Sequence, residues 1–97
     1  MKISTTHAMD KEAVRAKIDG GIVELVERFG RYASNLNHHW CGDTMEFSFN
    51  AVGADLVGSV HVTNRNVDLE IEVPSKFRIF EQQIKDEARD WCYKVLN

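Results

Sequence analysis

The sequence lacks the features that mark a flexible linker, a membrane-spanning protein or a secreted protein. Its 97 residues include one proline and six glycines, too few for a flexible or proline-rich linker. No stretch approaches the run of about 20 apolar residues that a membrane-spanning helix needs. Residues 1–6 lack the apolar segment of a secretory signal, so we expect no leader and a cytoplasmic location.

Basic charge is also scarce. The chain has 12 Lys and Arg against 15 Asp and Glu, a formal net charge of −3, and the two signs are interleaved. Domains that bind nucleic acid usually carry a basic patch or stripe that contacts phosphates. The sequence therefore predicts that nucleic acid is not a partner.

Cysteine is limited to Cys41 and Cys92, which lie far apart in the chain. In a chain without a recognisable signal, two isolated cysteines are typical of free thiols in a reducing compartment. Residues around Cys41 alternate between apolar and polar as in a strand, and this alternation directs Cys41 outward. Cys92 lies on an apolar helical stripe. We therefore expect no disulfide between them, because their side chains would have to meet within narrow distance limits.

Signatures of catalysis and of cofactor binding are missing too. The chain contains no nucleophilic serine motif, phosphate-binding loop, glycine-rich dinucleotide fingerprint or HExxH sequence. Asp43 and Asp55 fall in expected turns and Glu46 faces water, so none of them suggests an acid–base pair. We predict that the protein is not an enzyme and takes no cofactor.

What the chain does have is a period-two alternation of apolar and polar residues in its middle, typical of strands with one face in a core and one in water. We predict strands over 3–7, 36–41, 44–51, 56–63 and 67–73, with turns at 42–43, near 53 and at 64–65. The expected register buries a set of inner-face residues: Phe47, Phe49, Val60, Leu69 and Ile71. It also sets His39 opposite Glu46, and Gly58 opposite Phe49.

Helical spacing flanks this region on both sides. Apolar residues recur along one face from Val14 to Phe29, with Asp10 as the expected N-cap. Gly20-Gly21 predicts a kink or a close approach to the sheet. A closing helix is expected after Pro74, capped by Ser75, with one apolar stripe running to residue 95.

Together these elements predict one domain, 1–97, of the α+β class. The expected architecture is a two-layer sandwich: an antiparallel sheet of about five strands, in the chain order β-α-β-β-β-β-α, with two helices on one face.

The segment His38–Cys41 suggests a metal site, since imidazole and thiolate are the usual zinc ligands. Strand geometry argues against one, because His38 points inward while His39 and Cys41 point outward. His61 would be a third ligand on that outer face only if the strands bring it near. We therefore predict no metal site, and treat His38 either as a rim histidine or as a polar group in a small pocket.

The start of the closing helix carries more bulky apolar residues than one stripe needs. Either these side chains close the core, or they form an exposed patch for a partner. We take the whole segment as a candidate interaction surface: Lys76, Phe77, Arg78, Ile79 and Phe80.

Three groups of residues resemble one known family: Ile3…His7 with Glu12-Ala13, Trp40-x-Gly42-Asp43-x-x-Glu46-Phe47, and Gly58-x-Val60-x-Val62. This is the polyhydroxyalkanoic acid system protein family, small bacterial proteins whose genes lie near those for polyhydroxyalkanoate synthesis and granules. The resemblance covers nearly the whole chain. It implies a link to storage-polyester metabolism and maps no catalytic residue.

Two functions follow as expectations. The first is a non-enzymatic accessory protein that binds a polyester granule surface, a granule protein or another copy of itself. The alternative is a carrier that holds an acyl chain or hydroxyacid between the sheet and the helices; a minor enzyme of acyl metabolism is a third and weaker idea. A carrier needs an apolar cavity of about 300 Å³ or more, whereas an accessory protein needs a filled core and an exposed patch.

Overall fold

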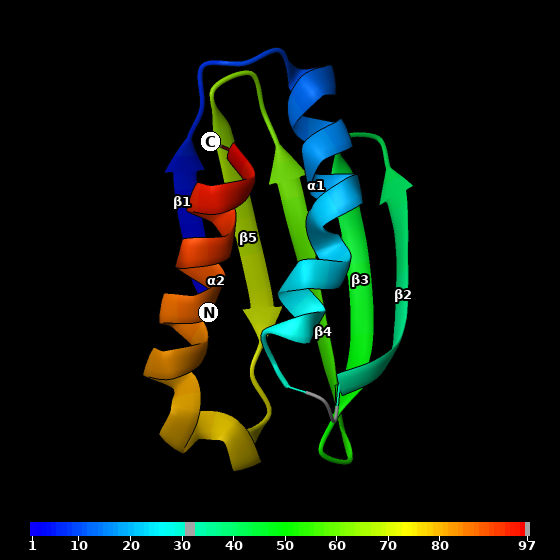
Figure 1. The fold of residues 1–97 in the computed structure, drawn as a ribbon, viewed down its shortest axis with the longest axis vertical. Helices are drawn as coiled ribbons and strands as arrows, with labels where there is room; N and C mark the ends of the chain where they lie inside the picture. Colours follow the sequence, from blue (N-terminus) through cyan, green and yellow to red (C-terminus); the bar gives the residue numbers. More distant parts are fainter. Residues whose placement is uncertain (31–32, 97) are drawn as a thin grey trace.

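The computed structural model describes residues 1–30 and 33–96, which form a five-stranded antiparallel sheet and two α-helices (Figure 1). The elements follow in the order β1 (Lys2–Thr6), α1 (Lys11–Glu27), β2 (Ala33–Cys41), β3 (Thr44–Ala51), β4 (Ala54–Val62), β5 (Asn66–Glu72), the 3₁₀-helix η1 (Ser75–Phe80) and α2 (Glu81–Leu96). In space the strands run β1-β5-β4-β3-β2, so β1 and β2 form the two edges. The predicted α+β class and element order are confirmed.

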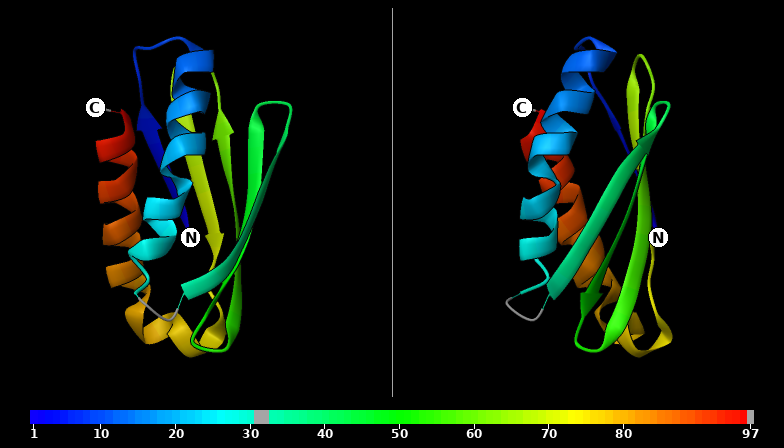
Figure 2. Two further views of the ribbon diagram at one scale, coloured as in Figure 1. Left: turned by 45° about the vertical axis from the view of Figure 1, so that its right-hand side comes forward. Right: turned by 90° about the vertical axis from the view of Figure 1, so that its right-hand side faces the viewer.

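Both helices lie on the same face of the sheet, α2 over β1 and β5 and α1 over the middle strands (Figures 1 and 2). The Trp91 indole N–H donates a 2.8 Å hydrogen bond to the Gly21 carbonyl, which joins α2 to α1. A Cβ on Gly21 would lie 3.1 Å from Val95 Cγ2. The predicted close approach at Gly21 is therefore to the other helix and not to the sheet.

The β2–β3 hairpin has the expected register. Its turn is Gly42-Asp43, and Gly42 has a φ of +60°, as the first position of a type II′ turn requires. His39 lies opposite Glu46, as predicted, and Trp40 lies opposite Met45. Asp43 accepts a 2.8 Å hydrogen bond from Lys11 Nζ, which lowers the pKa of its carboxyl and ties the turn to the start of α1.

The β3–β4 hairpin corrects one prediction. Its turn is the two-residue loop Val52-Gly53, with φ of +50° and +77°, and it sets Gly58 opposite Phe47 instead of Phe49. A turn centred one residue earlier moves every cross-strand pair by two residues. The ring of Phe47 then covers the bare backbone of Gly58, where a Cβ would lie 2.5 Å from Phe47 Cζ and from the Glu70 carbonyl oxygen.

The closing helix also differs from the prediction, because it does not begin at Ser75. The Phe77 amide donates to the Pro74 carbonyl at 2.9 Å, and residues 75–80 form a 3₁₀-helix before α2 starts at Glu81. A 3₁₀-helix has three residues per turn, so side chains three apart lie on the same side. Phe77 and Phe80 therefore project together instead of continuing the buried stripe of α2.

The core lies between the helices and the inner face of the sheet. All five predicted inner-face residues are at most 2% exposed. Cys41 is exposed and Cys92 is buried, and both are free thiols, as predicted. Burial raises the pKa of the Cys92 thiol to about 12.

Truncation of Phe47 tests this core. Phe47→Ala should lower the free energy of unfolding by about 3–5 kcal/mol, because it removes a buried ring and leaves a cavity. Ile79→Ala, at a side chain that is 83% exposed, should change it by less than about 0.5 kcal/mol. Urea denaturation measures both, and an unchanged midpoint for Phe47→Ala would contradict the assigned core.

The register correction has its own test. Gly58→Ala should destabilise the protein by about 1–3 kcal/mol, since the new methyl group would overlap Phe47 and a carbonyl. Gly20→Ala is the matched control, because no atom lies within 4 Å of the position of its Cβ. That helical substitution should stabilise the protein by up to about 1 kcal/mol. Similar denaturation midpoints for the two variants would count against the observed pairing.

Candidate functional site

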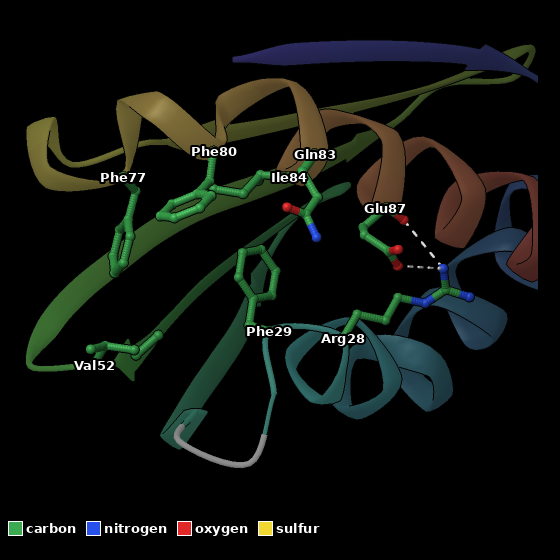
Figure 3. A pocket seen from close by; sticks show the side chains of 9 residues that line it. Arg28, Phe29, Val52, Phe77, Phe80, Gln83, Ile84 and Glu87 are labelled. Atoms are coloured by element: carbon green, nitrogen blue, oxygen red, sulfur yellow. Dashed lines mark hydrogen bonds and ion pairs between the residues drawn. The ribbon is translucent and has the colours of Figure 1, made fainter.

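An apolar pocket of about 260 Å³ opens at the end of the molecule where η1, the β3–β4 turn and the C-terminal end of α1 meet (Figure 3). Residues from four separate parts of the chain line it: Arg28, Phe29, Ala51, Val52, Phe77, Phe80, Gln83, Ile84 and Glu87. Aromatic and aliphatic side chains form most of the wall, and the charged groups among the described lining residues are Arg28 and Glu87, on one side.

Aromatic rings shape two walls of this pocket. Phe77 and Phe80 point from η1 toward Phe29 and Val52 on the other side (Figure 3). The Phe29 ring packs on the buried Phe49, with ring centroids 5.0 Å apart and planes tilted by 60°. One wall is therefore anchored on the core, whereas the other is carried by a single short helix.

The β3–β4 turn supplies a strained residue at the rim. Val52 is 59% exposed and has a φ of +50°, a left-handed conformation that β-branched residues rarely adopt. Lys76 Nζ donates a 2.6 Å hydrogen bond to the Val52 carbonyl and lies 5.5 Å from the centroid of the Phe77 ring. Lys76 thus joins the turn to η1. Backbone strain at an exposed apolar residue is a reason to suspect function at this rim.

Among the described residues on the polar side of the pocket, the positive charge of Arg28 is balanced by carboxylates. The Arg28 guanidinium lies 2.8 Å from Asp90, 3.4 Å from Glu87 and 3.6 Å from Glu24. The hydrogen bond to Asp90 raises the pKa of Arg28 above its ordinary value. Because three carboxylates surround one guanidinium, an added carboxylate ligand would meet net negative charge here.

The structure places the predicted interaction segment, residues 76–80, on η1. Phe77 and Phe80 line the pocket, Ile79 is 83% exposed and Phe80 is 52% exposed. We call Val52, Phe77, Ile79 and Phe80 the apolar end, with Lys76 and Arg78 beside it. Val52 was missed by the sequence prediction. The one sequence feature that could have indicated Val52 is its place directly before Gly53 in an expected turn, where asparagine is the usual residue.

His38 lies elsewhere. It projects from β2 toward α1, where its Nε2 is 3.6 Å from an Asp19 carboxylate oxygen, and its side chain is 34% exposed. The same carboxylate accepts a 3.0 Å hydrogen bond from the Trp40 indole. His38 is thus a rim residue on the inner face of the sheet, and it does not line the pocket at the apolar end.

Replacement of Val52 tests the strain. Val52→Asn creates an Asn-Gly turn, which tolerates left-handed backbone, and should stabilise the protein by about 1–2 kcal/mol. Val23→Asn is the matched control: Val23 is 53% exposed but helical, and its propensity hardly differs from that of asparagine. Thermal unfolding should show a higher Tm for Val52→Asn alone, and equal melting of the two variants would show that the turn is unstrained.

Comparison with known proteins gives one family. The family model of the polyhydroxyalkanoic acid system protein matches residues 1–96. No curated protein and no solved structure matches the chain. Among residues 1–30 and 33–96, no helix is both long and apolar enough to cross a membrane.

Proposed function

Because this chain belongs to the polyhydroxyalkanoic acid system protein family, we propose that it is a non-enzymatic accessory protein that binds the surface of a polyester granule through its apolar end. The observation that carries this proposal is an open apolar pocket whose rim includes the exposed Val52 and Phe80, with the exposed Ile79 next to Phe80 on η1. Contiguous apolar exposure of this kind marks an interaction site on a small domain, unlike apolar residues scattered singly.

The chemistry of the apolar end suits a polyester. An aliphatic polyester surface is apolar but presents ester carbonyl oxygens, which accept hydrogen bonds. Ile79 and Phe80 supply apolar area, and burial of each side chain contributes about 1.5–3 kcal/mol. Arg78 is exposed beside them and supplies donors for carbonyl or acidic groups at such a surface.

The open face of the sheet is charged, unlike the apolar end. This difference supports binding to the granule through the apolar end of the molecule and not through the sheet. The face of the sheet away from the helices is predominantly acidic, and on it Lys2 lies opposite Glu70. The carboxylates on this face are Glu46, Asp55, Asp68, Glu70 and Glu72. Charged groups lose hydration when they meet an apolar surface, so this face is suited to remain in water.

The alternative, a carrier of an acyl chain or hydroxyacid, is less well supported. The pocket at the apolar end holds about 260 Å³, below the lower end of the usual range for ligand pockets, about 300 Å³, and a larger hollow of about 380 Å³ between α1 and β2 is open to solvent. Among the described lining residues the one guanidinium, that of Arg28, is already paired with carboxylates, so it is not free to bind the carboxylate of a fatty acid or hydroxyacid.

Adsorption to amorphous poly(3-hydroxybutyrate) particles tests the proposal. The double variant Arg78→Ser/Ile79→Ser should bind about 10- to 100-fold more weakly, because it loses the apolar contact of one large side chain. Its Tm should match that of the unsubstituted protein, since both positions are exposed.

The matched control is Val23→Ser/Arg89→Ser, which removes one exposed aliphatic and one exposed basic side chain from the helices. This variant should adsorb as the original protein does. Equal adsorption of the two double variants would overturn the apolar end as the binding surface. Binding of a fluorescent fatty acid without adsorption to particles would favour the carrier instead.

A further inference from the structure

The β2–β3 hairpin (Figure 1) carries a second group of candidate side chains, on the face of the sheet away from the helices. His39 and Cys41 project from β2, and Glu46 lies opposite His39 on β3. Their ligand atoms all lie within 4.8 Å of one another, and His39 Nε2 is 3.6 Å from Glu46 Oε2. We propose that these three side chains bind a Zn²⁺ ion.

The donor set matches the ion. Imidazole nitrogen, thiolate sulfur and carboxylate oxygen are the three ligand types that Zn²⁺ takes in proteins, and three protein ligands leave a fourth position for water. Bonds of about 2.0–2.3 Å in a tetrahedron place ligand atoms about 3.3–3.8 Å apart. The separation between His39 and Glu46 already fits. The wider separations can close by side-chain rotation, because all three residues are exposed.

The backbone fixes which side chains meet. The two-residue turn at Gly42-Asp43 leaves the hairpin one register, and the ion pair from Lys11 to Asp43 fixes the turn against α1. In that register His39 and Cys41 share the outer face, and Glu46 is directly across from His39. A site on two paired strands needs only side chains to be ordered when the ion binds, which lowers the cost of binding.

The surroundings favour a cation over an anion. Glu70 and Glu72 lie on the same face and, with Glu46, line a shallow hollow beside the hairpin. Their negative potential attracts a divalent cation. His61, the third ligand considered from sequence, is not needed: its Nδ1 is hydrogen-bonded to Thr44 Oγ1 at 2.6 Å, and β3 separates it from Cys41.

Metal titration of the chain without a histidine tag tests this site. Zn²⁺ competition with a chromophoric chelator should give one ion per chain, and Co²⁺ should give the near-ultraviolet charge-transfer band of a thiolate ligand. Cys41→Ser should abolish that band. His39→Ala and Glu46→Gln should each weaken Zn²⁺ binding at least about tenfold. Buried Cys92 remains as the second thiol and should give no band.

His61→Ala and His38→Ala are the controls, since each removes an imidazole outside the proposed ligand set, and both should keep the original affinity. Survival of the Co²⁺ band in Cys41→Ser, or equal losses in His61→Ala and His39→Ala, would overturn the site. All variants should also adsorb to polyester particles as the unsubstituted protein does, so failure here is distinguishable from failure of the proposed granule binding.

Discussion

The two-residue turn between β3 and β4 is the constraint on which much of this structure depends. Val52 and Gly53 both adopt left-handed backbone, so β4 returns directly alongside β3 and Gly58 comes to lie beneath the ring of Phe47. The same turn carries Val52 to the rim of the apolar pocket, where Lys76 binds its carbonyl. One strained turn thus sets the register of β4 against β3 and positions one residue, Val52, of the proposed binding surface.

The 3₁₀-helix supplies the other three residues of the apolar end, Phe77, Ile79 and Phe80. Three residues per turn bring Phe77 and Phe80 to one side, and Ile79 is left pointing outward with 83% of its surface exposed. In an α-helix the two aromatic side chains would diverge by about 60°, given 3.6 residues per turn. The apolar end therefore depends on local helix geometry as much as on composition.

Charge is distributed unequally over the molecule. Carboxylates gather on the open sheet face and around Arg28, whereas Lys76 and Arg78 lie beside the apolar end. This separation lets one end approach an apolar surface while the acidic face stays hydrated. It also places the proposed zinc ligands on a different surface from the proposed granule contact, so one protein can be tested for each property separately.

The element order, the inner-face residues and the pairing of His39 with Glu46 could be predicted from the sequence, because period-two alternation and the Gly42-Asp43 turn fix faces and register locally. Other features depend on contacts between segments that are distant in the chain. The local sequence did not predict that Val52, a β-branched residue, adopts left-handed backbone in a turn. Lys76, 24 positions along the chain, helps to hold that turn by donating a hydrogen bond to the Val52 carbonyl. The exposure of Ile79 and Phe80 likewise depends on where separate segments meet in space.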